Sequence, residues 1–307
     1  MKKIVDYELQ DGCTVQPQTK KELVDIIKRT CKRKGWNCDL NFIDTSKITD
    51  MSRLFANIPT CYGGYGFRKF NCDISKWNVS NVKNMDSMFS GAKKFNQPLN
   101  DWNTSNVESM NYMFFDAISF NQPIENWVVS KVTTMHYMFG YAKNFNQPLD
   151  KWNVSKVKSM KGMFSHAKNF NQPIENWDVS NVSSMCSMFK NAISFNHPLE
   201  KWNVSNVEIM SHMFEEAKNF NQPLNNWNTS KVTSMSRMFK KAISFNQPLD
   251  EWDTKSVSKY LGLTDMFKFA ENFDNKIPSL KNFEFKRFDD KCFLLGLSHK
   301  LCRNCFE

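Results

Sequence analysis

Apolar residues recur with a fixed period over most of the chain. A tryptophan stands every 25 residues from Trp77 to Trp252, and a Phe-Asn pair keeps the same period from Phe70 to Phe245. A constant period of this size predicts a stacked array, because one unit is too small to bury its own apolar side chains. The tryptophans are expected to stack as one column: Trp77, Trp102, Trp127, Trp152, Trp177, Trp202, Trp227 and Trp252.

Two segments of each unit have different patterns. From Val82 to Ala92 the apolar residues are spaced 3, 3, 1 and 3, which fits one face of a short helix beginning near Ser80. The segment Gln97–Trp102 contains Pro98, which fixes φ and lacks a backbone donor, so we expect a short strand that begins at this proline. The pattern therefore predicts an α/β solenoid with one short strand and one short helix in each 25-residue coil.

The asparagine after each periodic phenylalanine is expected to form a polar ladder inside the turn. There its side chain would pair with backbone groups that an apolar residue would leave without a partner. These residues are Asn71, Asn96, Asn121, Asn146, Asn171, Asn196, Asn221 and Asn246.

Departures from the period divide the solenoid, residues 43–273, into three parts. A degenerate first unit, 43–69, contains the glycine-rich stretch Cys61–Gly66, which we interpret as a bulging loop without the motif of a phosphate-binding loop. Seven regular units follow over 70–244. The last unit, 245–273, has three extra residues near Tyr260–Gly262.

Residues outside the repeat are expected to cap both ends of the array. In residues 1–42, Thr19 and Glu22 form a capping-box pattern that predicts the start of an amphipathic helix. Its apolar face would comprise Leu23, Ile26, Ile27 and Cys31. Residues 274–307 are interpreted as a C-terminal cap.

Charge adds one alternative function. The chain has 41 Lys and Arg against 31 Asp and Glu, a formal charge of +10. Such an excess could attract nucleic acid or an anionic surface. The basic residues are scattered apart from the run Lys28–Lys34, and a lysine-rich solvated surface is the simpler interpretation.

Cysteine usage and the N-terminus favour an intracellular protein. The nine cysteines are odd in number and irregularly spaced, which argues against a disulfide framework and fits a reducing compartment. The segment Met1–Gln10 lacks the apolar stretch of a signal peptide, and no apolar run is long enough to span a bilayer.

The sequence offers few residues for catalysis or metal binding. Cys302 and Cys305 form a CxxC, with Cys292 and His299 upstream, and such a set could bind zinc. A lone CxxC is more simply a pair of free thiols, so we predict no metal site. The remaining histidines occupy unrelated positions in their units, and no catalytic carboxylate pair or triad order is present. We therefore expect no enzymatic activity, no cofactor and no small-molecule substrate.

A protein partner is the expected ligand. The residues predicted to be exposed differ between units, and neutral drift explains most of this variation. Tyr112, Tyr137 and Tyr141 are predicted to be exposed on successive units, and tyrosine is enriched in interface hot spots. These three tyrosines are the candidate binding residues.

The repeated pattern FNQPLxxWxVSxVxxMxxMFxxA resembles that of the BspA-like, leucine-rich-repeat-related surface proteins, also called the mycoplasma lipoprotein-associated repeat. The resemblance covers residues 43–273. It implies a right-handed, leucine-rich-repeat-like solenoid, with a role in adhesion or protein–protein interaction. It also implies a cell-surface location, in place of the intracellular one that the N-terminus favours. A structural part of a larger assembly is an alternative function for such an array.

Overall fold

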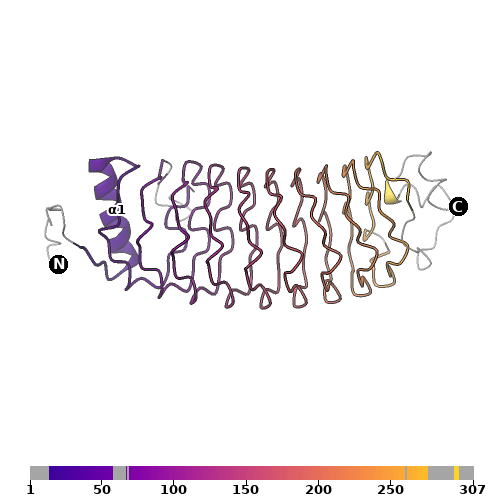
Figure 1. Cartoon of the computed structure of the whole chain (residues 1–307), viewed down its shortest axis with the longest axis horizontal. Helices are drawn as coiled ribbons and strands as arrows, with labels where there is room; N and C mark the ends of the chain where they lie inside the picture. Colours follow the sequence, from indigo (N-terminus) through magenta and orange to yellow (C-terminus); the bar gives the residue numbers. More distant parts are fainter. Residues whose placement is uncertain (1–13, 58–66, 68, 260, 276–293, 297–307) are drawn as a thin grey trace.

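The computed structural model describes residues 14–57, 67, 69–259, 261–275 and 294–296. The chain forms a row of similar coils stacked side by side along one long axis, with helix α1 (Lys20–Lys34) at the N-terminal end (Figure 1). In the described part of the repeated coils, no helix is present, and pairing between coils takes the form of isolated parallel bridges. The predicted solenoid is thus correct, whereas its secondary structure differs from the prediction.

Helix α1 begins and ends with caps that its sequence encodes. The Glu22 N–H donates to Thr19 Oγ1 at 3.2 Å, and Glu22 Oε2 accepts from the Gln18 N–H at 2.7 Å. The predicted capping box therefore forms, although the glutamate reaches Gln18 and not Thr19. Gly35, with a φ of 91°, ends the helix and donates its N–H to Cys31 O at 2.9 Å.

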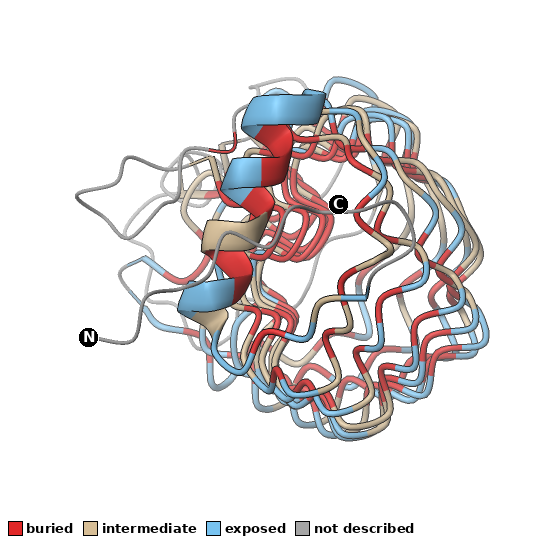
Figure 2. Ribbon diagram, turned by 90° about the vertical axis from the view of Figure 1, so that its left-hand side faces the viewer, coloured by how far each residue is buried: buried red, intermediate tan, exposed pale blue. Residues whose placement is uncertain are grey.

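α1 lies across the open end of the stack (Figure 2). Its buried residues include Leu23, Ile27 and Cys31, which join the core of the coils, and Ile26 is partly buried against the same core. An uncovered end would expose the apolar side chains of the first coil. The helix therefore does the capping work that its amphipathic pattern predicts.

The segment predicted to be helical in each coil is instead a ladder of turns, so this prediction is wrong. One coil donates to the next through the N–H groups of Met85, Ser87, Phe89 and Gly91, at N···O distances of 2.6 to 3.0 Å. Between them, Met88 and Ser90 donate to the carbonyls of Met85 and Ser87 at 3.1 Å, and the Asp86 N–H donates to Asn84 Oδ1 at 2.9 Å. Each ladder also contains a parallel bridge such as Asn84 to Ser109.

Left-handed residues explain why no helix forms. Ser87 and Gly91 have φ values of 56° and 70°, and the equivalent Tyr112 and Asp116 in the next coil have 55° and 54°. Two such residues four positions apart interrupt α-helical geometry and turn alternate N–H groups toward the neighbouring coil. The helix-like apolar spacing survives because the turns still place Met85, Met88 and Phe89 in the interior.

In the coils that contain the Phe-Asn-Gln-Pro segment, this segment carries no backbone bridge, so the strand predicted there is also wrong. The bridges between these coils lie in the ladder, whereas a bridge at the equivalent position occurs in the first regular unit, from Asp39 to Asp73. Side-chain amides link the coils here. Asn96 donates its N–H to Asn71 Oδ1 at 2.9 Å, and Gln97 Nε2 donates to Asn71 O at 3.1 Å. The same asparagine bond repeats in every coil to Asn246, whose Oδ1 accepts from the Asp274 N–H at 3.1 Å. These asparagines are exposed or half-buried, so their ladder runs along the surface.

Columns of identical side chains fill the interior. Each coil buries its Trp, two Met and two Phe almost completely, as in Trp152, Met160 and Phe164. Each tryptophan also donates its indole N–H to a carbonyl of the preceding coil, as Trp127 does to Leu99 O at 2.8 Å. Burying such a side chain is worth roughly 1.5–3 kcal/mol, before the entropy of ordering it is subtracted. Contacts between neighbouring coils therefore dominate the stability of the array.

The coils diverge from the ladder toward the tryptophan side. Backbone-paired chains lie about 4.8 Å apart. Ring centroids of equivalent residues are 5.4 to 5.8 Å apart in the column containing Phe89, 5.8 to 6.2 Å in that containing Phe95, and 6.2 to 6.5 Å in the tryptophan column. The stack therefore bends toward the ladder, which lies on its concave side.

The last coil keeps the ladder despite its insertion. Met235 donates its N–H to Gly262 O at 2.6 Å, 27 residues on, whereas Met85 pairs with Ser109, 24 residues on. The three extra residues are thus accommodated outside the ladder. In this last coil, the N–H groups of Asp265 and Phe267 donate to the carbonyls of Leu294 and Leu295. Part of the predicted C-terminal cap therefore pairs with the final coil.

Candidate functional site

The outer side of the ladder is the surface on which the coils differ most. We call it the ladder face and define it by Asp86, Ser87, Ser90 and Gly91 and their equivalents in each coil. Two of these four positions are left-handed, so the chain turns sharply there. The side chains at these positions range from buried to exposed, while the core positions beside them barely change.

Aromatic side chains cluster on the first half of the ladder face. The rings of Tyr112 and Tyr137 stack with centroids 5.4 Å apart, and those of Tyr141 and His166 stack at 4.1 Å. Phe115 packs edge-on against all three tyrosines at 5.3 to 6.1 Å. Tyr112 and Tyr141 are 38% and 36% exposed, so the cluster faces solvent. We call these five residues the aromatic patch.

Two glycines make room for the patch. A Cβ at Gly162 would lie 2.3 Å from Tyr137 Cε1, and one at Gly140 would lie 3.0 Å from Phe115 Cδ2. The rings of Tyr137 and Phe115 therefore lie directly against the backbone of the following coil. This contact fixes their orientation without a bound partner.

Two rings of the patch, Tyr137 and His166, have pKa values shifted by their surroundings. Burial raises the pKa of the Tyr137 phenol. Burial and the nearby Lys190 lower the pKa of His166. Both rings are therefore neutral at physiological pH, and the patch presents amphipathic aromatic surface without formal charge.

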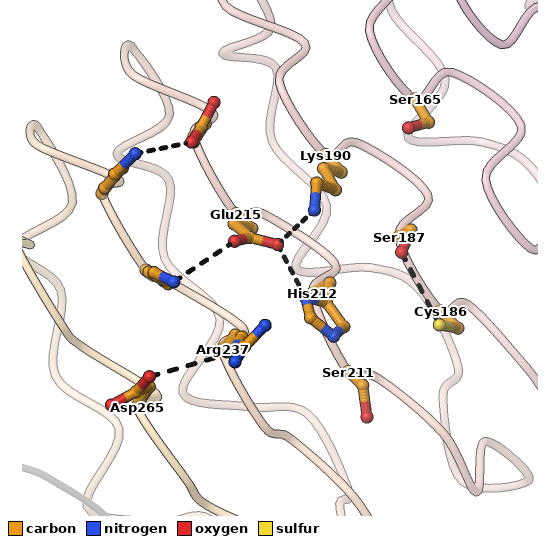
Figure 3. A network of polar contacts seen from close by, with 12 residues as sticks. Ser165, Cys186, Ser187, Lys190, Ser211, His212, Glu215, Arg237 and Asp265 are labelled. Carbon is orange, nitrogen blue, oxygen red and sulfur yellow. Dashed lines mark hydrogen bonds and ion pairs between the residues drawn. The ribbon is translucent and has the colours of Figure 1, made fainter. Parts of the chain in front are cut away.

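A network of charged residues continues the ladder face beyond the patch (Figure 3). Glu215, only 5% exposed, lies 2.7 Å from Lys190 Nζ and 2.6 Å from His212 Nδ1, and Lys240 Nζ is 4.0 Å away. Burial opposes ionisation of Glu215, but the hydrogen bonds from His212 and Lys190 outweigh it and lower its pKa to about 2. The carboxylate thus joins three consecutive coils.

Many lysines on the coils are paired with acids of a neighbouring coil. Lys93 and Asp116 are 3.1 Å apart, and Lys241 and Glu216 are 3.0 Å apart. These pairs place an acidic group beside each of these lysines, and the net excess of basic residues is unchanged. The residues Lys32–Lys34 at the end of α1 are exposed and form a basic group at the end of the stack.

Three cysteines meet where α1 joins the first coils. Cys31 is on α1, Cys38 follows the helix, and Cys72 is in the coil beneath; Cys72 Sγ is 3.6 Å from Cys31 Sγ and 3.3 Å from Cys38 Sγ. Burial, with hydrogen bonding to Cys72, raises the pKa of the Cys38 thiol to about 11. The hydrogen bond with Cys31, with burial, raises the pKa of Cys72 strongly. All three are free thiols.

Sequence reasoning identified part of these clusters. The structure brings the predicted Tyr112, Tyr137 and Tyr141 together, and adds Phe115 and His166, which the sequence analysis missed. One signal in the sequence could have identified Phe115 and His166: each is a ring at a position where most other coils have Gly or a polar or charged residue. The CxxC of Cys302 and Cys305, with Cys292 and His299, lies outside the described residues, as does the loop Cys61–Gly66.

Within the ranges that the structure describes, no helix has both the length and the apolar character needed to cross a membrane. No curated protein matches the chain significantly. Among solved structures, the leucine-rich-repeat protein LIC12759 of Leptospira interrogans is similar over 95% of this chain and 74% of that one, at 8% identity and a TM-score of 0.26. A score this low supports no conclusion about the fold.

A family model described as "Mycoplasma protein of unknown function, DUF285" matches residues 27–150, 123–208 and 197–293. The three matches follow one another along the repeats. They agree with the mycoplasma repeat named in the predicted resemblance and do not bear on the BspA-like proteins. Because the matches cover most of its length, this chain belongs to the DUF285 family.

Proposed function

We propose that this protein is a non-catalytic scaffold that binds a protein partner through the ladder face, with the aromatic patch as the centre of the contact. One observation carries the proposal: five aromatic side chains from three consecutive coils pack against one another outside the core and remain partly exposed. Stability does not require them, because most of the equivalent positions in other coils hold Gly or polar and charged residues such as Ser87, Asn191 and Lys240.

The geometry suits recognition of a protein surface. Tyrosine supplies a large contact area and a polar tip at little entropic cost, and it is enriched in hot spots. Stacking on Gly140 and Gly162 fixes the rings before binding, which lowers the cost of ordering them. The concave bend extends the surface that one partner can contact, and the charged network around Glu215 adds a polar rim beside the patch.

Adhesion at a cell surface or assembly into a larger structure are narrower forms of the same proposal, and the family resemblance suggests the first of them. Binding of nucleic acid or an anionic surface is the second candidate. Its specific support is the exposed basic group Lys32–Lys34 on α1. The ion pairs between coils make it the weaker candidate, because they set acidic groups beside lysines of the solenoid and so weaken the local positive potential there.

Affinity capture from the native source tests the proposal. Four baits are compared at low and high salt: the wild-type chain, the double variant Tyr112→Ser with Tyr141→Ser, Val128→Ser, and a triple alanine variant of Lys32–Lys34. Val128 is 46% exposed and lies outside the ladder face, so it controls for loss of an exposed apolar side chain.

We expect a discrete protein that survives high salt on the wild type and on Val128→Ser, and that is lost from the tyrosine variant. Equal recovery on the tyrosine variant would contradict the proposed face. Recovery of nucleic acid or lipid that salt releases, and that the α1 variant loses, would favour the second candidate.

A further inference from the structure

The three thiols at the end of α1 form a site that the proposed function does not use. Cys31 and Cys72 are 1% and 0% exposed, and Cys38 is partly exposed at the edge of the same cluster. All three sulfur atoms lie within 4.8 Å of one another. Cys31 lies on α1, Cys38 follows the helix, and Cys72 lies in a coil 34 residues after Cys38. Only the folded chain therefore brings the three thiols together.

The spacing of the sulfurs matches that of a thiolate metal site. Zinc binds sulfur at about 2.3 Å, and tetrahedral geometry then places two sulfur ligands about 3.8 Å apart. The sulfurs are 3.3 and 3.6 Å apart in the two closest pairs, so small side-chain rotations bring all three to that spacing. The nearest other polar atom recorded at Cys72 Sγ is Gly35 O, at 3.9 Å.

Two simpler explanations account for less of the geometry. A disulfide would require sulfurs about 2.05 Å apart, and it would use two of the three thiols. Ordinary core packing buries single cysteines as small apolar residues and does not require three of them to converge. Convergence of all three on one point is the feature that a metal ion explains.

We propose that Cys31, Cys38 and Cys72 bind a Zn²⁺ ion that joins α1 to the first coils. Zinc is favoured over Cu⁺ because three thiolates with Zn²⁺ leave a net charge of −1, whereas Cu⁺ leaves −2 in a largely buried site. The basic last turn of α1, Lys32–Lys34, offsets the remaining negative charge. The fourth position opens beside the partly exposed Cys38, where water or a small thiol completes the tetrahedron.

The ion would hold the N-terminal cap in place. One metal would link the C-terminal turn of α1, the chain after it and the coil beneath. Binding to a site that exists only in the folded chain stabilises that chain by mass action. Zinc should therefore raise the melting temperature of the reduced, metal-free protein.

The test uses the full chain, reduced and stripped of metal, and titrated with Zn²⁺ against a chromophoric chelator. The Cys302→Ser, Cys305→Ser double variant removes the other cysteine pair that could bind zinc, and it serves as the background. Cys38→Ser is added to this background because Cys38 is the most exposed of the three thiols, and Cys186→Ser is the matched control from a regular coil.

We expect one zinc per chain in the background and in the Cys186→Ser variant. The Cys38→Ser variant should bind zinc more than about 100-fold more weakly, because it loses a direct ligand. Loss of a residue that only orients a ligand already costs roughly 10–100-fold. Cobalt should give a thiolate charge-transfer band that Cys38→Ser loses. If Cys38→Ser fails to fold, alkylation of the background protein with and without zinc tests the proposal instead. Zinc should protect Cys31, Cys38 and Cys72 from alkylation. No zinc in the background, or binding and protection that do not involve these cysteines, would overturn the proposal.

Discussion

At the scale of single residues, the asparagine ladder shows how a side chain replaces a missing backbone bond. Asn171 Oδ1 accepts the Asn196 N–H at 3.0 Å, so a side-chain amide of one coil pairs with a backbone donor of the next. Asn171→Ala should lower the free energy of unfolding by about 0.5–1.5 kcal/mol, since one hydrogen bond is lost at a partly solvated site. Chemical denaturation measures the effect. The control is Asn144→Ala, at an exposed position outside the ladder, which should change the free energy of unfolding by less than about 0.5 kcal/mol. Equal losses of stability in Asn171→Ala and Asn144→Ala would contradict the role of the asparagine ladder.

Glu215 is the residue with the clearest pH dependence. Its folded pKa, about 2, lies below the ordinary value of 4.5, so its stabilising effect is present above pH 4.5 and is lost as pH falls toward 2. Glu215→Gln should therefore destabilise the protein at neutral pH, by about 1–2 kcal/mol once solvent screening of the partly exposed lysines is allowed for.

Melting temperatures of wild type and Glu215→Gln across this range are the measurement, with Glu251→Gln as an exposed control. The difference between wild type and Glu215→Gln should narrow as pH falls from 4.5. A difference that stays constant down to pH 2 would show that the charge of Glu215 is not responsible.

At the scale of the coil, the ladder depends on left-handed residues, and one of them also supports the aromatic patch. Gly162 has a φ of 62°, and an added Cβ would lie 2.3 Å from the ring of Tyr137. Gly162→Ala should thus displace Tyr137 as well as lower the melting temperature. Ser87→Ala, at the equivalent position with a φ of 56° and with Arg53 at the position of Tyr137 in the preceding coil, is the control. Ultraviolet absorbance of the tyrosines reports the displacement; if Ser87→Ala and Gly162→Ala behave alike, the proposed support by Gly162 is wrong.

The sequence predicted the coil's period and interior but not its backbone. Val82, Met85, Met88, Phe89 and Ala92 are all buried, as their spacing indicated, but the same spacing fits a helix and a ladder of turns. Left-handed φ at Ser87, Tyr112 or His212 leaves no reliable mark in the sequence, because none of these residues is glycine. The thiol cluster was missed for a related reason: Cys31, on α1, meets Cys72 only when the helix is docked on the stack.

At the scale of the molecule, each coil contacts mainly its two neighbours, so the array should tolerate removal of one complete unit. Deleting residues 170–194 brings Phe195 into the place of Phe170 and keeps every column in register. The protein should fold with buried tryptophans and a modestly lower melting temperature, since one set of coil contacts is lost. Tryptophan fluorescence and thermal melting measure this. Deleting residues 170–189 should prevent folding of the array, because it shifts the Trp, Phe and Asn columns out of register; a folded product would contradict the coil-stacking account.

A partner that contacts the ladder face at the aromatic patch should be captured there by site-specific photocrosslinking. A photoreactive phenylalanine analogue replaces Tyr141 in one variant and Val128 in the other; the two residues are similarly exposed but belong to different faces. Irradiation in extract from the native source should crosslink a discrete protein to position 141 and not to position 128. Crosslinking from position 128 alone, or equally from both positions, would contradict contact at the aromatic patch.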